Sequence, residues 1–310
     1  MKSPASRLIL ALALCLLTFA GCTPGGRDVV VVYTSQDQIY SEPILRAFTE
    51  ETGIQVRPVY DSEAVKTVGL ANRLLAEKSN PQCDLFWNNE ELRTWQLAAR
   101  DVFRVEHPWR SFGYRSRRLV INTNLLPFAD APQTLLELTN QTWRGKVALA
   151  YPMFGTTATH FQALRQHWGE EGWENWCRAL QANDSFVVDG NSVVVQFVGR
   201  GDAWIGLTDS DDIDAGRRQG LPIEALPIRN DSLLIPNTVA IVRNAPRPES
   251  AQKFLDYLTR PDVVEQLAEM GAIEGANPAM VDVATIQPDF PELLRELEPT
   301  TEQLKSIFLR

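Results

Sequence analysis

The feature that most constrains the fold is a regular alternation of strand-like and helix-like segments that begins at Val29. Residues 29–35, VVVVYTS, form a continuous run rich in β-branched residues, as expected for a strand buried on both faces. Residues 41–53 place apolar side chains at helical spacing, and Gly53 ends that helix. The strand–helix order repeats twice more over residues 54–103. Such repetition predicts an α/β fold, with a mainly parallel sheet covered by helices.

The rest of the chain contains the same two kinds of segment. The valine-rich residues 190–201 are interpreted as a helix, because Val194 recurs with Phe197 or Val198 at helical spacing; a strand is the alternative. We expect further strands over residues 54–61, 83–89, 117–126, 146–152, 185–189, 203–208 and 233–244. We expect further helices over residues 64–82, 90–103, 130–145, 153–168, 172–184, 209–220 and 248–271 (broken at Pro261), and from about Glu298.

This order predicts two α/β units, with the second inserted between the first and its return strand. Residues 29–118 and 233–275 form the first unit in this prediction, and residues 119–232 form the second. Residues 276–310 are expected to be a C-terminal helical segment that packs across both. Each unit would hold a mainly parallel sheet flanked by helices.

The first 28 residues are expected to be an export signal and a tether. Residues 8–21 are an apolar run of 14 after a short basic stretch, too short for the about 20 residues that span a bilayer. LTFAGC, residues 17–22, looks like a bacterial lipobox, which makes residues 1–21 a lipoprotein signal peptide and Cys22 the lipidation site. An ordinary signal peptide cut before Cys22 is the alternative. Residues 22–28 would then be a flexible tether.

The composition limits the classes of partner that the protein can bind. Without residues 1–21 the chain has 28 basic and 39 acidic residues, a net charge of −11, which argues against a nucleic-acid partner. A cationic ligand is allowed but not required, since acidity also serves solubility. Export permits a disulfide, yet Cys83 and Cys177 lie in distant segments and are expected to be separately buried thiols.

No motif in the sequence combines a nucleophile, a base and an orienting group. We therefore expect that the protein is not an enzyme and binds no cofactor. The chain has three histidines, His107, His160 and His167, and the last two are interpreted as ordinary residues of a helix surface. Motifs for a nucleotide loop, a nucleophile elbow and a zinc protease are missing from the sequence.

A cluster of aspartates follows the strand over residues 203–208. Asp209 or Ser210 can cap the next helix, while Asp211 and Asp212 would lie in its first turn, where the helix dipole favours acids. A calcium loop is excluded, because its sixth position is Asp214 instead of glycine and its twelfth is glycine instead of glutamate. The loop stands at the carboxyl end of a strand, where open α/β sheets bind ligands.

A second candidate follows the strand over residues 146–152. Gly155, Thr156 and Thr157 begin a helix, and such an N-terminus binds phosphate, sulfate or carboxylate. Simple capping by threonine is the alternative. Four polar strand-end loops are spread over both units, and together they predict a ligand cleft between them: Thr34–Asp37, Asn88–Glu90, Gly155–Thr157 and Asp209–Asp212.

These segments resemble the ferric-iron class of ABC-transporter substrate-binding proteins, which is related to thiamine and polyamine binders. The opening VVVYTSQDQ, the strand CDLFWNNE, and WRGKV at residues 143–147 carry the likeness, as does DGNSVVVQFVGRGDAWIGLTDSDD. The resemblance covers most of the chain after the signal. It implies the type II periplasmic-binding fold, with two lobes and a ligand cleft between them.

The resemblance also implies site residues. Iron-binding relatives place a tyrosine pair where Asp209 and Ser210 stand, a histidine at Asp37, and a glutamate at Asn89, with Glu90 next to it. Fe(III) accepts carboxylates in place of phenolates, which makes Asp37, Glu90 and Asp209 the expected metal ligands. The family's anion contacts fall near three residues that suit an anion: Gly155, Thr156 and Asn191.

The sequence therefore predicts a lipid-anchored, extracytoplasmic solute-binding component of an ABC importer. We expect a monomer that delivers ferric iron, with or without an accompanying anion, to permease subunits. A small phosphorylated, phosphonate or amine-bearing solute is the alternative, with an ammonium meeting Asp209 or Asp211. A sensor lipoprotein and an enzyme on the same fold remain more remote. The expected ligand-binding residues are Thr34, Ser35, Asp37, Asn89, Glu90, Gly155, Thr156, Thr157, Asn191, Asp209, Ser210 and Asp211.

Overall fold

The structure is a computed structural model that describes residues 28–61, 67–106, 108–276 and 285–309. The predicted signal peptide over residues 1–21, the lipidation site Cys22 and nearly all of the tether lie outside the described residues. Among the helices that are described, none combines the length and the apolar character needed to cross a membrane.

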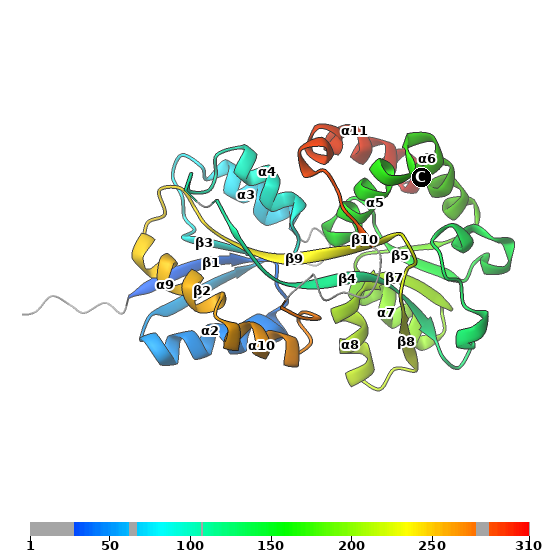
Figure 1. The fold of residues 1–310 in the computed structure, drawn as a ribbon, viewed down its shortest axis with the longest axis horizontal. Coiled ribbons are helices and arrows are strands. Elements are labelled where there is room, and N and C mark those ends of the chain that lie inside the picture. Colours follow the sequence, from blue (N-terminus) through cyan, green and yellow to red (C-terminus); the bar gives the residue numbers. More distant parts are fainter. Residues whose placement is uncertain (1–27, 62–66, 107, 277–284, 310) are drawn as a thin grey trace, which may run out of the picture.

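The first of two lobes contains three parallel strands in the order β2-β1-β3. These strands are β1 (Val29–Thr34), β2 (Gln55–Tyr60) and β3 (Leu85–Asn88). The helices of lobe 1 are α2 (Gln38–Thr52), α3 (Val68–Ala76), α4 (Leu92–Ala99), α9 (Pro248–Leu258) and α10 (Pro261–Glu269). They lie on both faces of the sheet in Figure 1, as parallel strands with crossover helices require.

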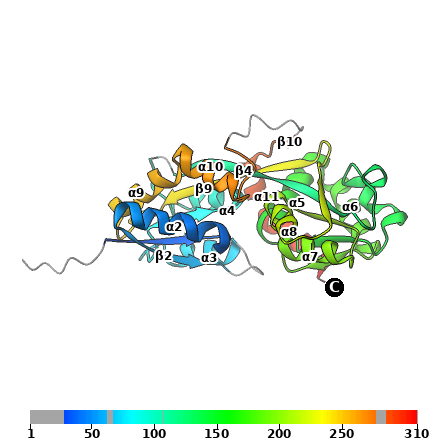
Figure 2. The same ribbon diagram turned by 90° about the horizontal axis from the view of Figure 1, so that it is seen from below.

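Lobe 2 repeats this arrangement with the parallel order β7-β5-β6. Its strands are β5 (Val147–Ala150), β6 (Phe186–Val188), β7 (Ile205–Asp209) and the additional β8 (Ile223–Leu226), which pairs antiparallel with β4. Its helices are α5 (Gly155–Trp168), α6 (Glu170–Ala182), α7 (Asn191–Arg200) and α8 (Ser210–Arg218). The two lobes stand side by side along the long axis in Figures 1 and 2.

Two long strands, β4 (Arg110–Asn122) and β9 (Ser232–Ile241), run between the lobes and join the two sheets. They are antiparallel to each other, and β9 is also antiparallel to β3. β4 changes partner along its length: residues 110–116 pair with β9, and residues 117–121 pair with β7. Its side chains from Arg115 to Arg117 therefore lie where the lobes meet.

The C-terminal helix α11 (Phe290–Phe308) contacts α4 of lobe 1 as well as α5 and α6 of lobe 2. Near its start, Leu293 and Leu297 bury Leu92, and near its end Phe308 joins the core of lobe 2. The helix begins eight residues earlier than the expected Glu298. The Asp289 carboxylate caps it by accepting the Glu292 N–H, and Pro299 is tolerated inside it.

The two lobes have separate hydrophobic cores, and each core holds one of the two described cysteines. Cys83 lies in the core of lobe 1 and Cys177 in the core under α5 and α6. Both are buried free thiols, which confirms the expectation of two separate thiols. A third cluster, which includes Val194, Val195 and Val198, packs α7 onto the other face of the lobe 2 sheet.

The structure confirms the helix over residues 190–201 and corrects five other elements. Residues 130–145 were expected to form a helix and a turn, but the region holds only short 3₁₀ turns, Phe128–Asp130, Leu136–Thr139 and Gln141–Trp143. The second helix ends at Ala76 instead of continuing to Pro81. β4 starts seven residues before the expected Arg117, because β9 offers it a second partner strand. The strands β8 and β10 (Thr285–Ile286) were missed, and β10 pairs with β9 inside the segment 276–310 that was expected to be helical.

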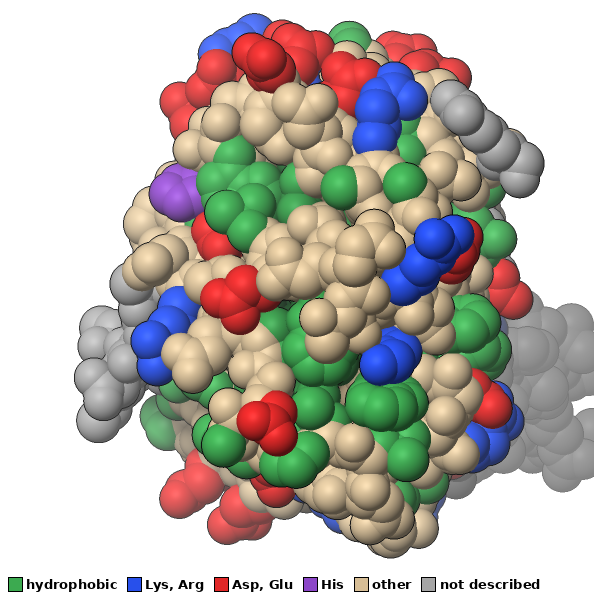
Figure 3. Space-filling model, turned by 90° about the vertical axis from the view of Figure 1, so that its right-hand side faces the viewer, with side chains coloured by type: hydrophobic (Ala, Val, Ile, Leu, Met, Phe, Trp, Pro, Cys, Tyr) green, Lys and Arg blue, Asp and Glu red, His purple; other side chains and the backbone are tan. Residues whose placement is uncertain are grey.

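Figure 3 faces the free end of lobe 2, where hydrophobic side chains are exposed among polar ones. In the segment 125–136 of this lobe the exposed large hydrophobic residues are Leu125, Phe128 and Leu136. Scattered exposure of this kind is common on proteins. The polar cavity described below lies instead where the lobes meet.

We expect Gly206→Ala to lower the free energy of unfolding by about 1–3 kcal/mol, the usual cost of overpacking a core. A Cβ at this position of β7 would come within 2.9 Å of a Val120 methyl and 3.1 Å of a Val198 methyl, and would collide with Val194. Urea unfolding measures the change. The control is Gly172→Ala on α6, whose Cβ would be 3.9 Å from Trp168 and which should unfold like the wild type or later. Equal stability of the two variants would contradict this packing.

Candidate functional site

A small polar cavity lies at the carboxyl ends of the strands, between the two lobes. Lobe 1 and the crossing strand β4 contribute Thr67, Asn89 and Arg115 to its wall. Its volume is about 30 Å³, enough for a water molecule or a bare ion. The residues from lobe 2 are Ala150, Tyr151, Phe154, Gly155, Thr156, Thr157, Asp189, Gly190, Asn191, Asp209 and Asp212.

Three helices of lobe 2 begin at this cavity. α5 begins with Gly155, α7 begins with Asn191 after Gly190, and α8 follows Asp209; each of these residues lines the wall. The first N–H groups of a helix have no partner within the helix and carry partial positive charge. The ends of α5 and α7 carry no acid in their first turn and make the cavity attractive for an anion, whereas Asp211 and Asp212 already lie in the first turn of α8.

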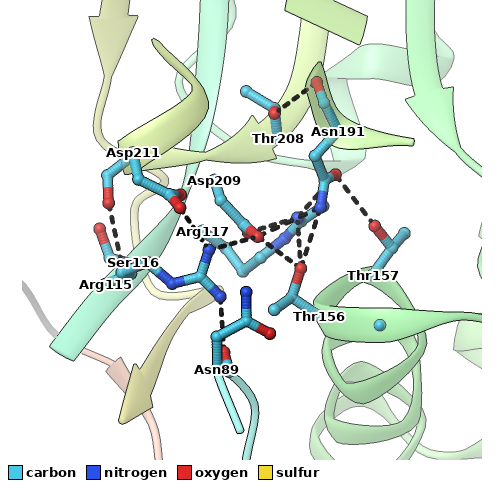
Figure 4. Close-up of polar contacts among 12 residues, drawn as sticks. Asn89, Arg115, Ser116, Arg117, Thr156, Thr157, Asn191, Thr208, Asp209 and Asp211 are labelled. Carbon is cyan, nitrogen blue, oxygen red and sulfur yellow. Dashed lines mark hydrogen bonds and ion pairs between the residues drawn. The ribbon is translucent and has the colours of Figure 1, made fainter. Parts of the chain in front are cut away.

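Asp209 is bonded to four side chains of the site (Figure 4). Its Oδ1 accepts from Arg117 Nη1 at 2.6 Å, and its Oδ2 accepts from the Thr156 hydroxyl at 2.5 Å and from Asn191 Nδ2 at 3.1 Å. Arg115 Nη1 lies 3.4 Å from Oδ2. Burial by itself would raise the pKa of Asp209, but the charges of Arg117 and Arg115 outweigh it and hold this pKa below its usual range. Asp209 is therefore an ionised carboxylate.

Arg115 connects the two lobes. Its Nη2 donates to the Asn89 carbonyl of lobe 1 at 2.6 Å, and its Nη1 donates to Asp211 Oδ2 of lobe 2 at 2.7 Å. Arg115 and Arg117 project from the same face of β4, two residues apart, and both are almost fully buried. Our sequence analysis missed both arginines. The usable signal was RSRR at the start of an expected strand, where charged residues at alternate positions precede an apolar run.

His160 accepts a hydrogen bond from Arg117 and so helps to hold its guanidinium in place. The interpretation of His160 as a surface residue was wrong: it is fully buried, because α11 and α6 cover α5. Burial, and next the charge of Arg117, lower the pKa of His160 to about 3, so the imidazole is neutral. Its Nδ1 accepts from Arg117 Nε at 3.4 Å, which assigns the proton to Nε2, 2.7 Å from the Asp231 carbonyl oxygen.

The two candidate loops of lobe 2 meet in this network. Within the described chain, Thr156 and Thr157 make no side-chain cap for α5, so the capping alternative does not hold. Thr157 instead donates to Asn191 Oδ1 at 3.1 Å. Asp209 occupies the cap position of α8, again with no side-chain capping bond among the described residues. Ser210, the other proposed cap, accepts from the Ser116 N–H at 3.3 Å.

Asp211 and Asp212 lie in the first turn of α8, as predicted. Asp209, Asp211 and Asp212 form a group with carboxylate oxygens within 4.8 Å of one another. The arginine pairs described above already bind two of the three, which reduces the negative charge this group offers to a cation.

The candidate residues of lobe 1 lie around the same strand ends, but mostly behind the cavity wall. The single proton of the Ser35 hydroxyl is shared between Asn88 Oδ1 at 2.7 Å and Asn89 Oδ1 at 2.8 Å, and Ser35 Oγ accepts the Asn89 N–H at 2.9 Å, which holds Asn89 in place. The Thr34 hydroxyl accepts the Gln36 N–H. Asn89 lines the cavity, and in Figure 4 its side chain lies below the arginines and faces Thr156.

The carboxylates expected to bind metal, Asp37, Glu90 and Asp209, do not share a site in this structure. Glu90 caps α4 by accepting the Leu92 N–H at 2.7 Å and the Arg93 N–H at 2.9 Å, and it also accepts from Thr159 of lobe 2. Asp37 precedes α2 and is not part of the cavity wall. That ligand set stays a prediction that this arrangement does not favour.

Two lobes, two crossing strands and a polar cavity where the lobes meet define a two-lobed binding fold. Residues 29–272 match the family model described as bacterial extracellular solute-binding protein, and the chain belongs to this family. The resemblance noted in the sequence is thereby confirmed at family level. The family consists of binding proteins and not of enzymes.

The chain is similar to the major ferric iron-binding protein of Neisseria gonorrhoeae, with 22% identity over 93% of this chain and 91% of that protein. Solved structures that share its fold include iron-bound HitA and AfuA. Iron-bound HitA from Pseudomonas aeruginosa has a TM-score of 0.79 and 18% identity, covering 91% of this chain and 99% of HitA. AfuA from Actinobacillus pleuropneumoniae, solved with fructose-6-phosphate, has a TM-score of 0.78 and 17% identity, covering 90% and 99%.

Proposed function

We propose that this protein is the solute-binding component of a bacterial ABC importer and holds its cargo in the cavity between the lobes. Lobe 1 would span residues 29–118 and 233–275, and lobe 2 residues 119–232, with residues 276–310 packing across them. The crossing strands β4 and β9 would serve as the hinge. Because the cavity holds only about 30 Å³, a larger cargo would enter when the lobes separate.

Location and partners follow from the same proposal. Cys22 would carry the lipid that anchors the protein outside the cytoplasm, and residues 22–28 would give the domain reach from the membrane. The domain would act as a monomer and deliver its cargo to permease subunits. We do not propose a nucleic-acid partner, because the chain has a net charge of −11 after removal of the signal peptide.

The geometry best supports a cargo that presents an oxyanion, such as a phosphate or phosphonate group. The observation that carries this conclusion is the convergence of two helix N-termini without first-turn acids, those of α5 and α7, and the Arg115 guanidinium on one cavity. Asp209 and Asp211 are bound by arginines, so the predicted ammonium contact with either residue has less support. The other two carboxylates of the wall are those of Asp189 and Asp212.

Ferric iron, with or without an accompanying anion, is the second candidate. The names of the similar proteins favour it, as does the group of Asp209, Asp211 and Asp212, and the cavity as it stands fits a bare ion. The arginines oppose it, because two guanidinium groups beside these carboxylates repel a trivalent cation. The tyrosine pair of the iron-binding relatives is also replaced here by Asp209 and Ser210.

We expect the exported protein to co-purify with a phosphorus-containing solute rather than with iron. Native mass spectrometry of the gently purified protein gives the added mass, and elemental analysis of the same sample counts phosphorus and iron per chain. About one phosphorus and no iron supports the phosphate-type cargo, and one iron with one phosphorus supports the second candidate with its anion. Iron without any oxyanion would overturn the proposed oxyanion site.

A further inference from the structure

The side of the cavity that faces lobe 1 differs in chemistry from the side formed by the helix ends. Its three contributors are Thr67, Asn89 and Arg115: a hydroxyl, an amide and a guanidinium. These groups bear no negative charge. A cation held between the lobes would meet no carboxylate on this side, whereas oxygen atoms of a solute would meet hydrogen-bond donors.

The Thr67 hydroxyl makes no hydrogen bond to any of the described residues. The residue is 1% exposed, and its Oγ1 is buried without a hydrogen-bond partner in that part of the chain. Thr67 precedes α3 at the cap position, yet it makes no side-chain capping bond there. A buried hydroxyl without a partner costs free energy, so such a group needs another explanation.

Arg115, on the same wall, also has a buried polar atom without a hydrogen-bond partner among the described residues. Its two terminal nitrogens are bonded to Asp211 and to the Asn89 carbonyl, but its Nε is buried and has no partner among the described residues. An Nε–H can only donate, so it calls for an acceptor oxygen. Two residues of one wall thus each have a buried polar atom that a ligand could satisfy.

We propose that Thr67 is a specificity residue that binds an uncharged oxygen of the cargo, such as a hydroxyl one or two carbons away from the phosphate group. The oxyanion lies at the Gly155–Thr157 end of α5, and the organic part of the solute lies against Thr67 and Arg115. The substrate class is a hydroxylated phosphate ester. This inference rests on the proposed oxyanion function and adds what the rest of the solute must offer.

Calorimetric titration of the ligand-free protein tests this with three probes: inorganic phosphate, methyl phosphate and glycerol 3-phosphate. The wild type should bind glycerol 3-phosphate at least tenfold more tightly than methyl phosphate, because only the former carries hydroxyls. Thr67→Val keeps the side-chain shape and removes the hydroxyl, so the preference for glycerol 3-phosphate over methyl phosphate should fall by about 3- to 10-fold, the contribution of one hydrogen bond. Thr67→Ser restores the hydroxyl and should restore the preference.

The melting temperature of the ligand-free variants separates this role from a structural one. Since the hydroxyl has no partner within the described protein, Thr67→Val should melt at or above the wild-type temperature. A lower melting temperature together with an unchanged preference would overturn the assignment of Thr67 alone. No preference in the wild type would also overturn it. Failure of all three probes to bind would overturn the oxyanion function, and this inference with it.

Discussion

Asp209→Ala is expected to lower the free energy of unfolding by about 3–5 kcal/mol, the usual cost of removing one partner from a buried ion pair. The carboxylate is 2% exposed, and its removal leaves the fully buried Arg117 without its anion. Arg115 retains Asp211, so the main loss falls on Arg117. Urea or thermal unfolding at neutral pH measures the effect.

Asp214→Ala is the matched control. Asp214 lies on the same helix α8 and pairs with Arg217 at 3.0 Å, but its side chain is 42% exposed, and exposed pairs contribute about 0–1 kcal/mol. If Asp209→Ala unfolds as readily as Asp214→Ala and no more, the buried network does not hold lobe 2 together in the way the contacts indicate.

His160 should make the protein less stable as the pH falls below about 6.5, the ordinary pKa of histidine. Its folded pKa is lowered to about 3, so between these two values the unfolded chain binds a proton that the folded chain refuses. The contribution of neutral His160 to the free energy of unfolding is therefore fully present above pH 6.5. It is lost as the pH falls towards 3, at roughly 1.4 kcal/mol per pH unit.

His160→Gln removes this titration, because glutamine stays neutral while its amide can still donate to the Asp231 carbonyl. We expect the difference in unfolding free energy between wild type and variant to shrink or reverse from pH 7 to pH 4.5. Other buried acids such as Glu90 titrate in both proteins, so the difference isolates His160. Parallel pH profiles for the two proteins would show that His160 is not held neutral.

Much of the fold could be predicted because it depends on local patterns. The apolar run before Thr34, the helical spacing from Val194 to Val198, and the helix start at Gly155 are all visible within one turn or one strand. The same holds for the first-turn positions of Asp211 and Asp212. The sequence pattern could not predict that residues 130–145 form only short turns. Their apolar residues Leu135, Leu138 and Trp143 are buried by tertiary packing and do not lie along one helix face.

The candidate site was predicted in part for a similar reason. Polar residues at strand ends mark the edge where a cavity forms, and this located Asn89, Gly155–Thr157 and Asp209, whereas Asn191 came from the family resemblance. Periodicity cannot reveal that Arg115, Arg117 and His160 are buried, because their partners are distant in sequence and burial of a charge depends on those partners. Thr67 was missed because it lies inside a predicted helix, with no polar strand end to mark it.

The position of the two arginines on β4 has a consequence for exchanging parts between related proteins. β4 belongs to neither lobe alone, and its side chains contact the Asn89 loop on one side and the Asp209–Asp211 segment on the other. A chimera that takes lobe 2 from a relative with tyrosines at positions 209 and 210 would keep Arg117 but lose its counter-ion. An exchange of the proposed cargo site between relatives would therefore have to transfer β4 and the β7–α8 junction together.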